Sequence, residues 1–141
     1  QGWRVRQRSH GLPAADTQIW LGDSMGEMAA YYTMADIAFI GGSLLPMGGQ
    51  NLIEAAACGC PVLLGPHMFN FRQASQDALA AGAAQQVTSS SELGLTVNHL
   101  FRKRNEMAAM RQAAIQFAQR HQGATQRTLD FIAERQDQAG H

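Results

Sequence analysis

The chain has 141 residues, 45% of them hydrophobic, with eleven basic and eleven acidic side chains. This length suits one domain with a single hydrophobic core, and the apolar content excludes disorder as a general description. The balanced charge argues against a broad nucleic-acid surface, and no apolar run approaches the roughly 18 residues of a membrane span. We therefore expect one soluble domain over residues 1–141, without a nucleic-acid partner.

Short apolar runs bounded by glycine or proline predict strands along the first two thirds of the chain. In chain order they cover residues 18–21, 36–40, 61–64 and 84–87, with a possible leading strand at residues 3–6. Helical patterns near residues 26–34, 50–59 and 70–81 lie between them. This alternation predicts an α/β fold, with a Rossmann-like parallel sheet of four or five strands flanked by helices.

The pattern becomes helical after residue 87 and stays so to about residue 136, which predicts a helical C-terminal third. Gly123 is the position where we expect this stretch to break. Beyond it, Leu129, Ile132 and Ala133 form an apolar stripe at helical spacing. We expect residues 122–141 to form a helix and tail, either mobile or packed against a neighbour in a crystal, with part of that stripe exposed.

Three segments that follow predicted strands hold most of the unusual residues: 22–27, 41–51 and 65–70. Ligands of parallel α/β sheets bind at the carboxyl ends of the strands. All three segments should therefore converge on one rim of the domain.

The middle segment contains four glycines within residues 41–49, which bring backbone N–H groups close to a ligand. A helix predicted near Asn51 would add the N–H groups of its first turn, which suit a phosphate. Glu54 lies one turn further on, where a carboxylate can accept hydrogen bonds from both hydroxyls of a ribose. The segment lacks the spacing of a dinucleotide fingerprint and the lysine of a P-loop.

Structural explanations exist for several of these residues. Asn51-x-x-Glu54 is also the pattern of a helix capping box, as are Ser24-x-x-Glu27 and Ser89-x-x-Glu92. The glycine pairs on both sides of Ser43 favour a ligand in the middle segment, because a simple connection does not need them.

Four further residues have candidate roles. The lone His67 is equally consistent with a structural role and with a ligand contact. Asn70 is predicted to cap a helix that starts at Phe71. Cys58 and Cys60 are too close in sequence for an ordinary disulfide and are expected to be small buried hydrophobes, with no metal site.

Taken in order, residues 22–27, 41–44, 48–54 and 65–71 resemble the C-terminal domain of the 3-deoxy-D-manno-octulosonic acid (Kdo) transferases of Gram-negative bacteria. These are inverting enzymes of glycosyltransferase family 30 with the GT-B fold. The resemblance runs from about residue 16 to residue 87. The family usually has His where this chain has Gln50, and proline at Leu52 and Ala55, which puts a protonation role at position 50 in doubt.

The resemblance implies that this chain is the donor-binding half of an enzyme that transfers Kdo from CMP-Kdo to a lipid A precursor of lipopolysaccharide. A separate N-terminal acceptor domain would supply the catalytic base and the membrane contact, at the cytoplasmic face of the inner membrane. The present chain would then be a fragment, inactive alone and without catalytic residues. Its last helix would cross back to the missing domain. No cofactor and no metal are implied.

The residues that the resemblance assigns to donor binding lie on loops after predicted strands: Met25, Gly26, Glu27, Gly41, Gly42, Ser43, Gly49, Gln50, Asn51 and Glu54, with His67 and Asn70 as further candidates. Two alternatives use the same residues. One is a GT-B transferase domain with a UDP-sugar donor, and the other is a non-catalytic nucleotide-binding or interaction module.

Overall fold

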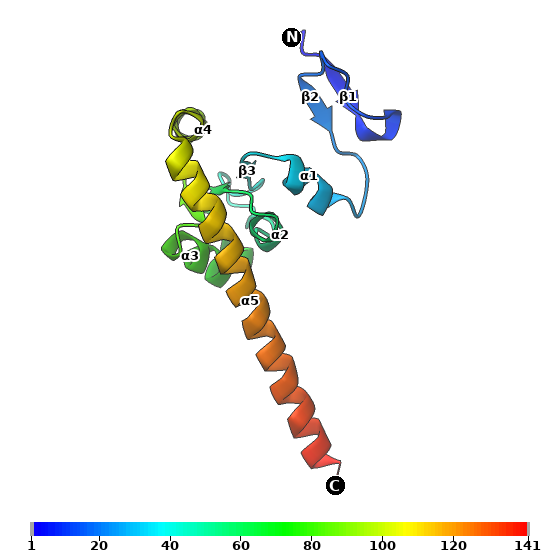
Figure 1. Ribbon diagram of the computed structural model, residues 1–141, viewed down its shortest axis with the longest axis vertical. Helices are drawn as coiled ribbons and strands as arrows, with labels where there is room; N and C mark the ends of the chain where they lie inside the picture. Colours follow the sequence, from blue (N-terminus) through cyan, green and yellow to red (C-terminus); the bar gives the residue numbers. More distant parts are fainter. Residues whose placement is uncertain (1, 141) are drawn as a thin grey trace.

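The computed structural model describes residues 2–140, so that Gln1 and His141, the ends of the predicted domain, lie outside the described residues. The strands are β1 (Val5–Gln7), β2 (Ile19–Leu21), β3 (Ala38–Phe39), β4 (Val62–Leu64) and β5 (Ala84–Gln86). Every strand pairing is parallel, which confirms the predicted α/β class (Figure 1).

The strands form two sheets, one of β1 and β2 and one in the order β3-β4-β5. The prediction of one sheet of four or five strands is therefore wrong. β2 buries little, since Ile19 and Leu21 are 43% and 49% exposed. Its central residue, Trp20, instead packs edge-on against Tyr31 of α1 (Met28–Met34), with ring centroids 5.5 Å apart.

The core lies around β4, which is buried along its whole length. Val62 and Leu64 pack in a cluster with α2 (Ile53–Ala57), α3 (Arg72–Ala80) and the middle of α5 (Arg104–Ala139). Leu63 points to the other face and packs with Leu100 of α4 (Ser90–Arg102) and with Met107 and Met110 of α5. Both faces of β4 are thus covered, as its continuous apolar run predicts.

The helical C-terminal third is confirmed, but the break lies at Lys103 and the prediction of Gly123 is wrong. Lys103 leaves the helical region (φ −105°, ψ 73°), so that α4 and the start of α5 can pack on the same cluster. Gly123 lies inside α5, where a glycine costs only about 0.5–1 kcal/mol relative to alanine. α5 continues to Ala139, beyond the predicted helix end.

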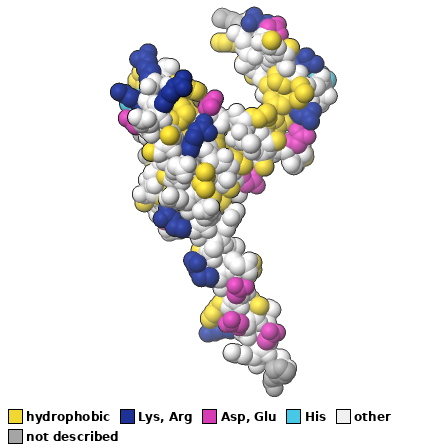
Figure 2. Space-filling model, viewed as in Figure 1, with side chains coloured by type: hydrophobic (Ala, Val, Ile, Leu, Met, Phe, Trp, Pro, Cys, Tyr) yellow, Lys and Arg dark blue, Asp and Glu magenta, His cyan; other side chains and the backbone are white. Residues whose placement is uncertain are grey.

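The C-terminal half of α5 projects away from the rest of the molecule (Figure 1). Leu129 and Ile132 are 55% and 47% exposed and Ala133 is exposed as well, which confirms the predicted exposure of this stripe. In the space-filling view, hydrophobic side chains lie between acidic ones along this extension (Figure 2). The crossing to another domain and the mobility of residues 122–141 stay predictions.

Candidate nucleotide-binding site

Two of the three predicted loop segments lie side by side at the carboxyl edge of the β3-β4-β5 sheet. The amide of His67 donates to the carbonyl of Ser43 at 2.9 Å, and the amide of Asn70 donates to the carbonyl of Gly48 at 3.1 Å. The loop after β3 is itself closed by a 3.1 Å bond from the Gly49 amide to the Gly42 carbonyl. The predicted convergence is therefore confirmed for segments 41–51 and 65–70.

Ser43 holds these two loops together through its side chain. The residue is fully buried, and its hydroxyl donates to the Ile40 carbonyl at 2.5 Å while it accepts from the Gly65 amide at 2.8 Å. The hydroxyl is thus committed to the protein. A ligand contact at this position would have to use the backbone amide, which the loop must first expose, because no atom of Ser43 is accessible.

The glycines of the site fall into two groups, those that the packing of the loops explains and those that border open space. A Cβ at Gly65 would overlap the backbone of Ser43 and Leu44, and one at Gly49 would overlap the sulfur of Met68. Loop packing explains Gly65, and the same packing together with a positive φ of 74° explains Gly49, without a ligand. A Cβ at Gly41 would meet no atom within 4 Å, so open space lies beside its backbone.

The backbone amides of Gly41 and Gly42 donate no hydrogen bond within the described residues. They are the open part of the loop, since Gly41 is exposed and Gly42 half-buried. Unpaired backbone N–H groups at the carboxyl end of a strand can donate to an anion.

The capping box that the Asn51-x-x-Glu54 pattern allows as an alternative does not form at the start of α2. The side chain of Asn51 accepts from the Ile53 amide at 2.9 Å, while Leu52 is the N-cap residue. The Glu54 carboxylate is exposed and makes no hydrogen bond or ion pair within the part of the chain that is described. It is therefore available to a ligand, as is the exposed Gln50 beside this loop.

Glu54 has a neighbour on α1. Burial of Tyr32 and the negative charge of Glu54 raise the pKa of the Tyr32 phenol above its ordinary value of 10.0. α2 has only five residues, so its dipole can contribute little to a phosphate site. The open glycine amides have to supply most of the donors.

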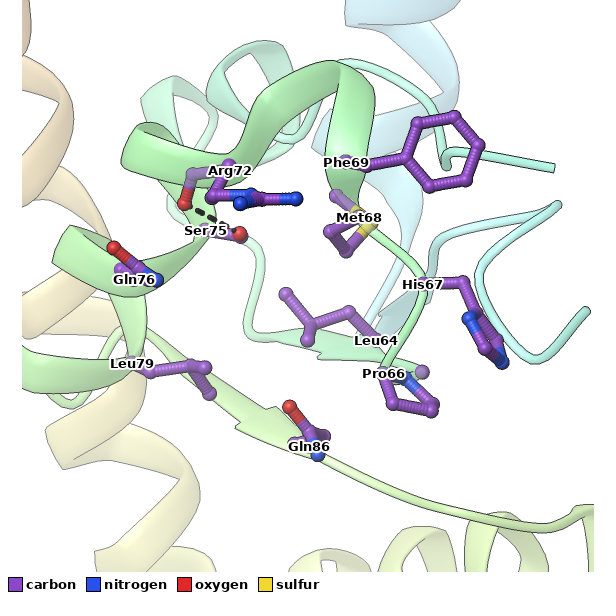
Figure 3. Close-up of a pocket in the computed structure, with 11 residues that line it drawn as sticks. Leu64, Pro66, His67, Met68, Phe69, Arg72, Ser75, Gln76, Leu79 and Gln86 are labelled. Carbon is purple, nitrogen blue, oxygen red and sulfur yellow. Dashed lines mark hydrogen bonds between the residues drawn. The ribbon is translucent and has the colours of Figure 1, made fainter. Parts of the chain in front are cut away.

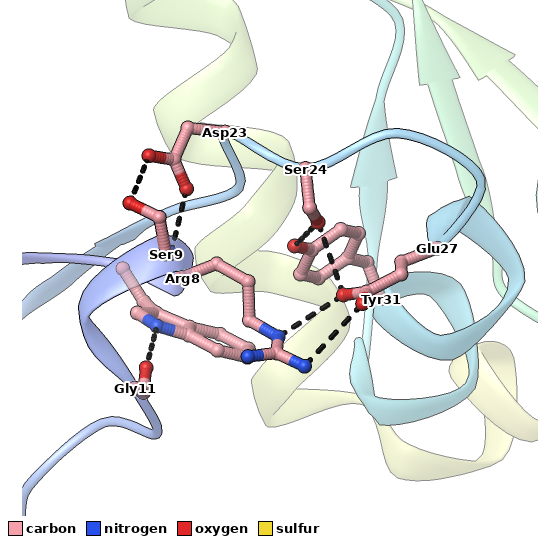
Figure 4. Close-up of polar contacts among 8 residues, drawn as sticks. Arg8, Ser9, Gly11, Asp23, Ser24, Glu27 and Tyr31 are labelled. Atoms are coloured by element: carbon pink, nitrogen blue, oxygen red, sulfur yellow. Dashed lines mark hydrogen bonds and ion pairs between the residues drawn. The ribbon is translucent and has the colours of Figure 1, made fainter.

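The third predicted segment, residues 22–27, does not join the other two. Figure 4 shows that both carboxylate oxygens of Glu27 accept from the Arg8 guanidinium, at 3.0 and 3.3 Å. Ser24 also donates to Glu27, and Asp23 accepts from Ser9, whose hydrogen bonds lower the Asp23 pKa. No hydrogen bond within the described residues links this segment to the other loops, so the predicted three-way convergence is wrong here.

Met25 and Gly26 lie at the tip of that segment. Met25 is 95% exposed, and a Cβ at Gly26 would meet no atom within 4 Å. The Ser24-x-x-Glu27 pattern does not cap α1 either, because Glu27 itself is the N-cap and no side chain bonds there. The Glu27 carboxylate pairs with Arg8, the residue directly after β1, instead of capping α1 or facing the glycine loop.

A cavity of about 370 Å³ opens beside the loop after β4, between that loop, α3 and the end of β5 (Figure 3). His67 lines it, whereas Asn70 does not. Asn70 lies in a short 3-10 helix (Phe69–Phe71) and its predicted capping role is wrong, because Phe71 precedes α3 and no side chain caps it. Arg72 also lines the cavity and was not among the predicted site residues.

Cys60 is fully buried and Cys58 half-buried, both as free thiols, which fits the predicted small hydrophobes. Within residues 2–140 no group of three or more potential ligand side chains is placed to hold a metal ion. None of the described helices is both long and apolar enough for a transmembrane segment.

Comparison with known proteins identifies a family match and similar sequences. The chain matches the family described as "Glycosyl transferases group 1" over residues 4–117. It is similar to the 3-deoxy-D-manno-octulosonic acid transferases of Bordetella pertussis and Haemophilus influenzae, at 43% and 35% identity over 129 residues each. The aligned regions cover 92% and 91% of this chain and 30% of each relative, so the chain spans less than a third of their length.

A solved structure resembles the fold as well. It is the crystal structure of the C-terminal CMP-Kdo binding domain of WaaA from Acinetobacter baumannii, with a TM-score of 0.77 and 27% sequence identity. The match covers 83% of this chain and 62% of that one.

Proposed function

The chain belongs to the group 1 glycosyl transferase family, and on this premise we propose that it is the donor-binding domain of a Kdo transferase, with CMP-Kdo as its donor. Three facts support the proposal: the similarity to Kdo transferases over nearly the whole chain, the similarity to a CMP-Kdo binding domain, and the open loop at the sheet edge.

The observation that carries the proposal is that the loop after β3 has open amides and leads directly into α2, where the Glu54 carboxylate has no partner within the described residues. The amides of Gly42, Ser43 and Asn51 would donate to the phosphate of CMP, and Glu54 would accept from the two ribose hydroxyls. Within residues 2–140 the amides of Gly41 and Gly42 and the carboxylate of Glu54 are unpaired, which fits these roles. Gly49 and Gln50 lie between them on the loop.

The wider reaction is part of the same proposal. An acceptor hydroxyl of a lipid A precursor, deprotonated by a base outside this chain, attacks the anomeric carbon of Kdo as CMP leaves with inversion. Donors aimed at the phosphate stabilise the charge that develops on the leaving group. The acceptor domain, the site at the inner membrane and the absence of a metal requirement stay predictions.

The rival donors can be separated by nucleotide titration. We expect CMP to bind at about 0.1–1 mM and more tightly than UMP or UDP. A preference for UDP would favour a UDP-sugar transferase, and no preference among the three would favour a non-catalytic module.

The decisive experiment maps CMP binding by the amide chemical shifts of the chain. CMP should shift the amides of Gly42, Ser43 and Asn51, and leave those of residues 104–120 in place. Absence of any shift along this loop at millimolar CMP would contradict the proposal.

Glu54→Ala is the matching variant. It should weaken CMP binding about tenfold, because a carboxylate that accepts two hydrogen bonds is lost, and should weaken 2′-deoxy-CMP less. Since Glu54 makes no bond within the described residues, the free energy of unfolding should change by less than about 0.5 kcal/mol. Glu134→Ala, at an exposed carboxylate of α5, is the control and should change neither quantity.

A further inference from the structure

The cavity beside the glycine loop differs chemically from the nucleotide rim. Its polar lining includes Arg72, Gln76, Gln86, Ser75 and His67, and its apolar lining includes Leu64 and Pro66. Figure 3 shows Arg72 and Gln76 on the α3 side and Gln86 on the β5 side, around Leu64. No acidic residue lines it, so its only formal charge is the positive charge of Arg72.

Three polar side chains of this cavity, those of Arg72, Gln76 and Gln86, are not used by the protein itself. Within residues 2–140 the Arg72 guanidinium forms no ion pair and no hydrogen bond, although arginines 4, 8 and 111 do. The side chains of Gln76 and Gln86 have no hydrogen-bond partner among the described residues either. The nearest acid on the helix, Asp77, is bonded to Gln73 and does not line the cavity.

The start of α3 holds Arg72 at this place. The buried hydroxyl of Ser75 donates to the Arg72 carbonyl at 2.9 Å, and the Asn70 amide ties the preceding turn to Gly48. Gly65 and His67 line the cavity and also bond to Ser43. The cavity therefore begins where the nucleotide loop is anchored.

We propose that this cavity binds the sugar acid of the donor, with the Arg72 guanidinium paired to its carboxylate. The inference rests on the proposed function, which places the nucleotide on the adjacent loop. A guanidinium binds a carboxylate through two parallel hydrogen bonds, and glutamine side chains both donate to and accept from sugar hydroxyls. The volume of about 370 Å³ lies within the usual range of small-ligand sites.

The phosphate of the donor is the other anion that Arg72 could pair with, and two titrations distinguish them. Free 3-deoxy-octulosonic acid carries the carboxylate without a phosphate, and CMP carries the phosphate without the carboxylate. Arg72→Gln should weaken binding of the free acid about tenfold or more and change CMP binding by less than about twofold. Arg72→Lys keeps the positive charge but loses the paired N–H donors of the guanidinium. Its affinity for the free acid should lie between those of the wild type and Arg72→Gln.

Two controls complete the experiment. Arg102→Gln removes an exposed arginine at the end of α4 and should leave both titrations unchanged. The methyl ester of the sugar acid should bind the wild type as weakly as the free acid binds Arg72→Gln. Amide shifts of residues 65–72 report the site directly.

The inference is overturned if Arg72→Gln weakens CMP and spares the free acid, because Arg72 would then pair with the phosphate. It is overturned equally if neither titration responds. The proposed function fails by a different result, the lack of any CMP shift on residues 41–51, so the two failures are distinguishable.

Discussion

Burial at Cys60 links a single thiol to the alkaline stability of the domain. The side chain is fully buried, and desolvation raises its pKa from 9.0 to about 11. The thiol stays neutral in the folded state at pH values where it already ionises in the unfolded chain. Its contribution to stability is therefore complete below about pH 9 and is lost as the pH rises through about 11.

This sign gives a testable pH profile. The free energy of unfolding should fall between about pH 9 and pH 11, and Cys60→Ala should flatten that fall. Cys58→Ala keeps the buried thiol and should retain the slope. Urea unfolding at a series of pH values measures it, and equal slopes in the two variants would contradict the assignment.

Single residues also show where sequence reasoning succeeds and where it stops. The glycines around Ser43 predict a ligand loop, yet Gly49 and Gly65 are required by the packing of one loop on another. Such contacts depend on which loops become neighbours, and a single sequence does not reveal them. Arg72 was missed for the same reason, since only the folded cavity distinguishes it from any exposed arginine.

At the scale of elements, a helix-capping pattern in the sequence predicted the structure at α4 but not at α2. Ser89 caps α4 through the Glu92 amide, as the capping-box pattern predicts, while the Glu92 carboxylate accepts from Thr88, one residue before the cap. The same pattern at Asn51 and Glu54 does not form a box. Strands and helices were placed to within a few residues because their apolar runs are bounded by glycine and proline.

Gly123 offers a test at this scale. Because it lies inside α5, with only the Arg127 guanidinium near its Cβ position at 3.5 Å, Gly123→Ala should stabilise the helix by about 0.5–1 kcal/mol. Far-UV circular dichroism should show slightly higher helicity, and thermal unfolding a higher midpoint.

Gly140→Ala, at the end of α5, is the control and should have little effect. A loss of helicity in Gly123→Ala would instead indicate a break at residue 123.

At the scale of the whole molecule, the N-terminal strand pair is attached to the remainder through few side chains. Arg8 binds Glu27 across the approach to α1 (Figure 4). Trp20 packs edge-on against Tyr31. The strand sequences predicted parallel strands, but not which strands would pair. Strands of three residues pair according to which elements cover them. Because β1 and β2 are largely exposed, their sequences carry little information about their partners.

Glu27→Gln tests this attachment. The pair is about a third exposed, so its loss should cost no more than about 1 kcal/mol and speed amide exchange in residues 5–21 by up to about fivefold. Exchange in β3, β4 and β5 should stay unchanged. Glu134→Gln serves as the control, and protection that persists in Glu27→Gln would show that other contacts hold the strand pair.

The length of α5 also determines how the molecule rotates in solution. Its 36 residues extend about 54 Å, which makes the particle elongated along the helix. The N–H bonds of a helix lie nearly parallel to its axis, so those of α5 reorient mainly by end-over-end tumbling, the slowest rotation of a rod. Their resonances will be broader than those of the strands as long as the helix is rigid, and local fraying near its end will narrow them.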